Sequence, residues 1–288
     1  MAHEWCIAGR ALPIGTRTLV MGVLNVTPDS FSDGKQFLSP DKALAHAEQM
    51  IADGADIIDV GGESTRPGAE LISPEDELQR VLPVIEELVK RTTVPISIDT
   101  TKAVVARAAL DAGAAIVNDI SALRFDFHIA DEVAKSAAGL VLMHSRGTPA
   151  TMQKLPPVAD ILDEVTNSLR SSIAMAERRG VKPESIVIDP GIGFGKTREQ
   201  NIQLIAGLDR LAQAFPDFPI LIGTSRKSFI GRLLTDENGE PAAAADRLHG
   251  TMASITVAVL RGAHIVRVHD VKAAVETVRI ADAMNGIT

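Results

Sequence analysis

The chain has 288 residues, 45% of them hydrophobic and 23% charged, which is the balance of a globular protein with one large core. Its formal net charge of −8 at pH 7 excludes nucleic acid and anionic membranes as expected partners, because both require a basic face. The single cysteine, Cys6, excludes an intrachain disulfide and a thiolate metal cluster, and it favours a reducing compartment, the cytoplasm.

Residues 1–17 precede the first strongly apolar run and contain Pro13 and Gly15. They show neither the basic start nor the apolar stretch of a signal peptide, and no run in the chain approaches the roughly 18 apolar residues of a membrane span. We expect a short hairpin or flap here, over the end of the domain opposite to the active site. Residues 18–288 are expected to form one domain.

From residue 19 onward, eight short runs rich in Val, Ile and Leu alternate with longer amphipathic stretches. The first stretch has a capping serine, Ser39, then Pro40 in the first turn and Gly54 at the end, which are the signals of a helix. Eight strand–helix units predict an α/β fold of the (β/α)8 TIM-barrel type. The apolar runs are residues 19–25, 56–61, 94–99, 115–119, 140–144, 186–190, 220–225 and 264–269.

Polar side chains stand at or near the end of every run, where a buried strand would not use them for packing. They are Asn25, Asp59, Asp99, Asn118, His144, Asp189, Ser225 and His269. Each Asp or Asn alone could simply cap the following helix. Because the carboxyl ends of parallel barrel strands meet on the face that carries active sites, eight such residues together predict a functional face.

A glycine-rich segment, GIGFGKT at 191–197, differs from two nucleotide-binding motifs. A P-loop needs glycine five residues before Gly195, where this chain has Pro190. The glycines at 191, 193 and 195 also lack the G-x-G-x-x-G spacing of a dinucleotide site. We therefore exclude both motifs, and the glycines leave backbone room for a flat ligand.

Eight motifs lie in register along residues 20–270. The four longest are NVTPDSFSDG (25–34), DVGGESTRPG (59–68), DPGIGFGK (189–196) and TSRKSFIG (224–231). The others are SIDT (97–100), VNDIS (117–121), LMHSRGTP (142–149) and RVHD (267–270). In sequence and in order they closely resemble the dihydropteroate synthase family of pterin-binding enzymes, over nearly the whole predicted barrel.

The resemblance implies a reaction in folate biosynthesis. In it, 6-hydroxymethyl-7,8-dihydropterin diphosphate condenses with p-aminobenzoate to give 7,8-dihydropteroate and diphosphate. The resemblance also implies Mg²⁺ as cofactor, these two small molecules as partners, sulfonamides as competitive ligands, and a homodimer. The dimer is expected to form through the late helices, where the small-residue stretch 250–262 permits close packing.

A pterin is a flat heterocycle with a dense edge of hydrogen-bond donors and acceptors, so its pocket needs rigidly held carboxylates and amides. The carboxylate of Asp189 can accept two N–H bonds from the amino-pyrimidinone edge, and Lys227 can donate to the ring carbonyl and a ring nitrogen. The resemblance implies a pterin site of Asp99, Asn118, Met143, Asp189, Gly223 and Lys227.

The leaving diphosphate carries several negative charges, which an acidic chain repels, so cations must converge locally. Arg267 and His269 are two residues apart in an extended run and therefore lie on one face of the eighth strand. A salt-bridged core arginine is the alternative interpretation of Arg267. The resemblance implies a diphosphate site of Asn25, Thr65, Arg66, Arg267 and His269, with Asn25 as the protein ligand to Mg²⁺.

The loops after the first two strands are rich in Gly, Pro, Ser and Asp and can close over the bound ester. The resemblance implies a p-aminobenzoate site of Phe31, Thr65, Pro67, Phe194 and Ser228. Two positions depart from the family pattern. Lys35 stands where a second glycine is common, and Ser145 stands where methionine or another residue is frequent.

We expect an electrostatic and positional mechanism. The methylene under attack lies between an electron-rich ring and a good leaving group, so we expect ionisation to a ring-stabilised cation before amine attack, without a covalent enzyme intermediate. The expected catalytic residues are Asp99, which stabilises the cation, together with Arg66, Lys227, Arg267 and His269. Two alternatives remain open: a pterin-dependent methyltransferase of the same superfamily, and a non-catalytic pterin-binding barrel.

Overall fold

The computed structural model describes residues 3–27, 40–66 and 68–286. It opens with an antiparallel hairpin of β1 (His3–Ile7) and β2 (Arg10–Ile14), which turns through Ala8 and Gly9, both with positive φ angles. The hairpin predicted near the start of the chain is confirmed. Ser39, the expected cap of the first helix, lies outside the described residues.

Eight parallel strands follow, hydrogen-bonded in the order β8-β7-β6-β5-β4-β3-β10-β9. A parallel bridge between Ile188 and Ile220 joins the two ends of this order, so the sheet closes into a barrel and confirms the predicted fold. The strands are β3 (Leu19–Asn25), β4 (Ile57–Gly61), β5 (Ile96–Asp99), β6 (Ile116–Asp119), β7 (Gly139–Met143), β8 (Ile186–Asp189), β9 (Leu221–Ile222) and β10 (Ile265–Val268).

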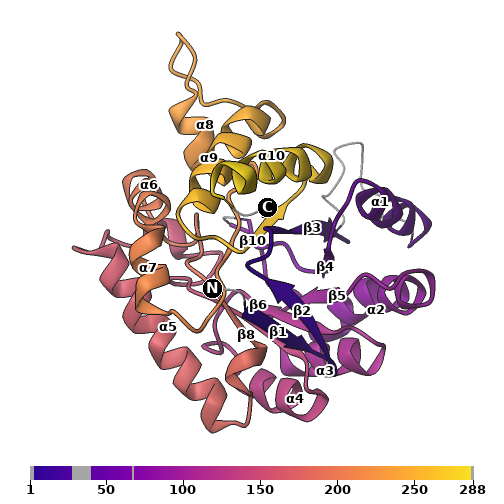
Figure 1. Cartoon of the computed structure of the whole chain (residues 1–288). Coiled ribbons are helices and arrows are strands. Elements are labelled where there is room, and N and C mark those ends of the chain that lie inside the picture. The colour runs from indigo at the N-terminus through magenta and orange to yellow at the C-terminus, as the bar shows by residue number, and fades with distance from the viewer. Residues whose placement is uncertain (1–2, 28–39, 67, 287–288) are drawn as a thin grey trace.

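Helices form a ring around the strands, and Figure 1 shows them from the end that the hairpin covers. They are α1 (Pro40–Ala52), α2 (Pro74–Arg91), α3 (Ala103–Asp111), α4 (Ile129–Ser136), α5 (Ile161–Arg178), α6 (Arg198–Ala206), α7 (Leu208–Ala214), α8 (Ser228–Leu233), α9 (Leu248–Leu260) and α10 (Val271–Met284). Single 3-10 turns occur at Met152–Lys154, Pro183–Ser185 and Ala244–Arg247. Among the described helices, none combines the length and the apolar character needed to cross a bilayer.

Side chains alternate between the two faces of each strand, and this alternation separates two apolar cores. In β10, Val266 and Val268 belong to the outer core between strands and helices, whereas Ile265 belongs to the core inside the barrel. Arg267 is two residues beyond Ile265 and so shares its inward face. The apolar interior at the amino ends of the strands therefore gives way to polar side chains at their carboxyl ends.

The N-terminal hairpin closes the apolar end of the barrel. Trp5, Ile7 and Ile14 are fully buried in the inner core. The Nε1–H of Trp5 donates to the carbonyl oxygen of Ser185 at 2.8 Å. Gly139 makes room for the hairpin, since a Cβ atom there would lie 2.6 Å from Cγ2 of Ile7. The polar end of the barrel, at the carboxyl ends of the strands, lies opposite to this closure.

Candidate active site

The polar residues predicted from the run ends lie around the carboxyl ends of the strands. Asn25, Asp59, Asp99, Asn118 and Asp189 lie on β3, β4, β5, β6 and β8, respectively. Asp99 pairs in register with Asn118 on the neighbouring strand. Because the strands are parallel, these side chains share one rim of the barrel, which is the end where active sites form in this fold.

An arginine held by two carboxylates lies at the centre of this rim. Arg267 donates from Nε to Oδ2 of Asp59 at 2.6 Å and from Nη2 to Oδ2 of Asp99 at 2.7 Å. Oδ2 of Asp59 also accepts from Nδ2 of Asn118 at 2.9 Å. Arg267 thus has the ion pairs of a core arginine, yet 22% of its side chain remains exposed at the rim. The described residues provide no acceptor for its Nη1, which leaves that nitrogen for a ligand.

The charges in this cluster shift each other's protonation. Burial raises the pKa of Asp99 to about 7, with Arg267 opposing the shift and Asp59 adding to it. Burial works against the charge of Arg267, but Asp59 and Asp99 outweigh it and raise the pKa of Arg267 above its usual range. Arg267 therefore stays charged, whereas Asp99 changes its charge near neutral pH.

Asp189 and Lys227 form a second part of the rim. Oδ1 of Asp189 accepts from the N–H of Gly191 at 2.7 Å. Nζ of Lys227 donates to the carbonyl oxygen of Ile192 and lies 4.7 Å from the ring centroid of Phe194. Burial lowers the pKa of Lys227 to about 8, and burial raises the pKa of Asp189; each group opposes the shift of the other. A carboxylate and an ammonium group therefore lie close together here.

Gly223 joins the two parts of the rim. A Cβ atom at Gly223 would lie 3.8 Å from Nζ of Lys227 and 3.8 Å from Cβ of Arg267. Met143 is buried at the end of β7, in register with Asp189 on β8. The structure therefore brings together all six residues of the predicted pterin site.

A buried lysine that the sequence analysis missed fixes the glycine-rich loop after β8. Nζ of Lys196 donates to the carbonyl oxygens of Gly191 at 2.7 Å, Phe194 at 3.1 Å and His144 at 3.3 Å. Burial lowers the pKa of Lys196 well below its usual value. A Cβ atom at Gly191 would lie 1.8 Å from the carbonyl oxygen of His144, so this approach requires glycine. The sequence analysis included Gly191 and Lys196 in a motif but gave the lysine no role; their closeness in the sequence was the signal available for it.

His269 follows β10 at the edge of the rim. Its Nδ1 lies 3.0 Å from Oγ of Ser225, which also accepts from the His269 backbone N–H at 3.2 Å. Burial, together with the positive charges of Arg267, Arg226 and Arg66, lowers the pKa of His269 to about 4. The exposed Arg66 on the loop after β4 is therefore close enough to act on this ring. The ring of His269 is therefore neutral at pH 7 in this structure, and its place in the diphosphate site stays a prediction.

The oxygens around Asn25 fit a magnesium ion held mainly by the phosphates of a ligand. Asn25 is half-buried, and a Cβ atom at Gly61 would lie 3.8 Å from both Oδ1 of Asn25 and Oδ2 of Asp99. The described residues contain no group of three or more His, Cys, Asp or Glu side chains that could hold a metal. Mg²⁺ keeps waters and phosphate oxygens in its shell and needs few protein ligands. These residues therefore fit that ion.

The predicted p-aminobenzoate residues are only partly described. Thr65 and Phe194 are half-buried in the loops after β4 and β8, and Ser228 is exposed at the start of α8. Phe31 and Pro67 lie outside the described residues, as does Lys35.

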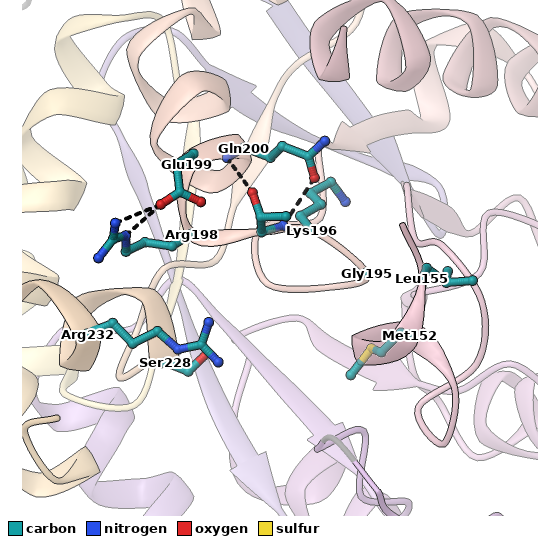
Figure 2. A pocket seen from close by; sticks show the side chains of 10 residues that line it. Met152, Leu155, Gly195, Lys196, Arg198, Glu199, Gln200, Ser228 and Arg232 are labelled. Carbon is teal, nitrogen blue, oxygen red and sulfur yellow. Dashed lines mark hydrogen bonds and ion pairs between the residues drawn. The ribbon is translucent and has the colours of Figure 1, made fainter. Parts of the chain in front are cut away.

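A cavity of about 470 Å³ is lined in part by Ser228 and is shown in Figure 2. It lies beside the strand-end cluster and not over it, because none of the strand-end polar residues lines it. Its lining consists of Met152, Leu155, Gly195, Lys196, Thr197, Arg198, Glu199, Gln200, Ser228 and Arg232. The cavity thus extends the predicted arylamine region outward between the loop after β8 and α8.

A cluster of charged residues holds the ends of the loop that carries Thr65 and Arg66, and the sequence analysis did not predict it. Nζ of Lys102 lies 2.5 Å from Oε2 of Glu77 and 3.1 Å from Oε2 of Glu63. Oε1 of Glu63 accepts from the N–H of Ile72 at 2.8 Å. Glu77 is completely buried, so its charge depends on this lysine. The cluster ties the two ends of the loop to the start of α3.

Comparisons with known proteins agree with this geometry. The profile of the family described as pterin binding enzyme matches residues 21–269. A dihydropteroate synthase from Synechocystis is 48% identical over 270 residues, which are 94% of this chain and 91% of that protein. The Yersinia pestis dihydropteroate synthase, solved with a sulfonamide drug complex, superimposes with a TM-score of 0.91 at 40% identity and covers 98% of this chain and 99% of its own. The Xanthomonas albilineans enzyme with 4-aminobenzoic acid has a TM-score of 0.89 at 42% identity, with 100% of both chains covered.

Proposed function

The chain belongs to the pterin binding enzyme family, and from this we propose that it condenses 6-hydroxymethyl-7,8-dihydropterin diphosphate with p-aminobenzoate to give 7,8-dihydropteroate and diphosphate. The observation that carries the proposal is that two separate groups of polar residues lie on the same rim of the barrel. Asp189 and Lys227 suit a heterocyclic edge, and the carboxylate-held Arg267 suits a phosphate. A substrate with a pterin at one end and a diphosphate at the other needs both groups.

The pterin ring binds between Asn118, Asp189 and Lys227. The carboxylate of Asp189 accepts from the amino-pyrimidinone edge, and Lys227 donates to the ring carbonyl and a ring nitrogen. The pKa of Lys227, lowered to about 8 by burial, leaves it mostly protonated at pH 7. Met143 and Gly223 supply an apolar contact and backbone room beside the ring.

The diphosphate binds at the other side of the rim. Nη1 of Arg267 and the neutral ring of His269 donate to its oxygens, and Thr65 and Arg66 approach from the loop after β4. Asn25 would supply the protein oxygen for Mg²⁺, and the ion would neutralise charge on the diphosphate. Arg267 is held by Asp59 and Asp99 in this structure, so its position is set before a ligand binds.

The rim acts by position and charge. Departure of the diphosphate breaks the carbon–oxygen bond, and the carboxylate of Asp99 stabilises the resulting ring-conjugated cation until the neutral arylamine attacks. The amine loses its proton after attack, so no dedicated base is needed. Exchange of labelled diphosphate into the ester without p-aminobenzoate is expected, and strict dependence of bond cleavage on the amine would contradict this order of events.

Sulfonamides compete for the p-aminobenzoate position in this proposal, as para-substituted arylamines of similar shape. This is supported by the sulfonamide and 4-aminobenzoic acid complexes of the two structural relatives. The single cysteine supports the cytoplasm as the location.

We also propose a homodimer through α9 and α10. Val257 and Leu260 on α9, and Ile280 and Met284 on α10, are exposed large hydrophobic side chains, and apolar surface of this kind favours a protein contact. A monomer in light scattering at working concentration would contradict this proposal.

Turnover by the purified chain tests the proposed function. With the pterin ester, p-aminobenzoate and Mg²⁺, the wild type should form dihydropteroate and release diphosphate. Asn25→Ala and Arg267→Ala should lose most of this turnover, whereas Arg17→Ala, which removes a surface pair with Asp56, should keep it. Absence of product with the wild type, or methyl transfer to a corrinoid acceptor, would contradict the proposal.

A further inference from the structure

One cation in the cavity beside Ser228, Arg232, has no partner among the residues that the structure describes. Arg232 is exposed in the last turn of α8, and the described part of the chain offers its guanidinium neither a hydrogen-bond acceptor nor an ion pair. The other two basic residues of the cavity are engaged. Arg198 pairs with Glu199 at 2.8 Å, and Lys196 donates to three backbone carbonyl oxygens. Arg232 therefore supplies the positive charge that this cavity can offer to a ligand.

The fold holds Arg232 on the same face of α8 as Ser228. Residues four apart in a helix are neighbours on its surface, and Figure 2 shows the two side chains next to each other at the cavity. Phe229 anchors another face of the helix in the core. Gly231 packs so closely against Arg247 that a Cβ atom would lie 2.6 Å from its Nε. The helix is thus fixed in rotation, and Arg232 remains directed toward the cavity.

The carboxylate of p-aminobenzoate brings a negative charge to the side of the site where the cavity lies. Its amine must approach the reacting methylene at the rim near Asp99, so its carboxylate, para to the amine, points away from the rim. Ser228 is both a predicted contact of the benzoate ring and a lining residue of the cavity, so the carboxylate end faces the cavity. In a chain with a net charge of −8, an anionic substituent is attracted there only if a local cation meets it.

We propose that Arg232 binds the carboxylate of the arylamine and makes the site prefer acidic over neutral arylamines. This inference rests on the proposed function and assigns a specificity residue to the same site. A guanidinium can form two parallel N–H···O bonds with a carboxylate, whereas a carboxamide brings no charge. Arg232 takes no part in carbon–oxygen cleavage, because it lies on the cavity side of the arylamine.

Two arylamine substrates of the same shape, p-aminobenzoate and p-aminobenzamide, test this role by steady-state kinetics. In Arg232→Gln, the KM for p-aminobenzoate should rise roughly three- to tenfold, the range of an ion pair between surface exposure and partial burial. The KM for p-aminobenzamide, the KM for the pterin ester and kcat should stay unchanged. Arg232→Lys should recover part of the affinity, because the ammonium group keeps the charge but cannot form two parallel bonds. Added salt should raise the KM for p-aminobenzoate more in the wild type than in Arg232→Gln. Arg198→Gln, in the same cavity, is the matched control and should leave all four quantities unchanged.

The outcomes separate the two proposals. An unchanged KM for p-aminobenzoate in Arg232→Gln overturns the role of Arg232 while the proposed function stands. An equal rise in the KM values for p-aminobenzoate and p-aminobenzamide does the same. A wild type that makes no product from p-aminobenzoate overturns the proposed function, and the role of Arg232 with it.

Discussion

At the scale of single residues, Asp59 links the two hydrogen-bonded parts of the strand-end cluster. Its Oδ2 accepts from both Arg267 and Asn118, while its Oδ1 has no partner among the described residues. The side chain is completely buried, so Asp59 has no surface for a ligand. Its role is to orient a guanidinium and an amide that do face the ligand.

Asp59→Asn tests this positioning role. The amide keeps the shape but removes the charge, so Arg267 retains only Asp99 as a full ionic partner. We expect kcat to fall roughly 10- to 100-fold, as for other residues that orient a binding group, with the fold retained in circular dichroism. Asp209→Asn removes a surface pair with Arg261 and should change neither. An unchanged kcat in Asp59→Asn would show that Arg267 is held without it.

The pKa values of Asp99 and Lys227 predict the pH dependence of activity. Burial raises the pKa of Asp99 to about 7, so its carboxylate form increases as the pH rises through that value. Burial lowers the pKa of Lys227 to about 8, so its ammonium form is lost above that value. Because the proposed reaction needs both charges, kcat/KM for the pterin ester should be bell-shaped, with its maximum between these values. Asp99→Asn should lose the acidic limb, and a flat wild-type profile would contradict the assignment.

At the scale of elements, loops between strands and helices hold the ligand groups in place. The loop after β8 depends on Lys196 and on the close approach of Gly191 to His144. The loops after β6 and β7 are joined because Oγ of Ser145 accepts from Nη2 of Arg124 at 2.7 Å. The serine that departs from the family pattern therefore has a structural partner.

A pair of glycine substitutions tests the loop after β8. Gly191 and Gly239 both have positive φ angles, but only Gly191 has no room for a side chain, since its Cβ atom would lie 1.8 Å from a backbone oxygen, while Gly239 has nothing within 4 Å. Gly239→Ala should cost about 1 kcal/mol of unfolding free energy from its φ angle alone. Gly191→Ala should cost more than about 3 kcal/mol in urea unfolding and also weaken pterin binding. Equal costs for the two variants would contradict the steric argument.

The sequence predicted the elements better than the contacts between them. β3 coincides with its predicted apolar run, because a buried strand can be predicted from local composition. β9 is shorter than predicted and keeps only Leu221–Ile222 of its six-residue run. Asn25 and Asp189 could also be predicted as site residues, because each is a polar residue at the end of an apolar run. The bond from Arg267 to Asp59 joins residues 208 positions apart, so only barrel closure brings it about. The neutral state of His269 likewise follows from burial, which the sequence does not give.

At the scale of the whole molecule, the barrel has one end for stability and one for chemistry. The hairpin with Trp5 closes the amino ends of the strands over an apolar core. The polar rim occupies the opposite end, with Arg267 at its centre. Stability and catalysis should therefore respond separately to substitutions at the two ends.

Trp5→Ala tests this separation. Trp5 is fully buried and its Nε1–H is satisfied, so its removal leaves a cavity and should cost about 3–5 kcal/mol in the free energy of unfolding. The kcat of the remaining folded enzyme should equal that of the wild type. Val104→Ala, at an exposed position of α3, should alter neither quantity by much. A Trp5→Ala enzyme with unchanged stability, or with lowered kcat while folded, would contradict the division.

A crystal structure with the pterin diphosphate ester and Mg²⁺ tests the central claim most directly, namely that one rim grips both ends of this substrate. We predict the pterin edge on Asp189 and Lys227, and phosphate oxygens within hydrogen-bond distance of Nη1 of Arg267. A ligand bound away from the carboxyl ends of the strands, or one whose diphosphate does not contact Arg267, would contradict the account.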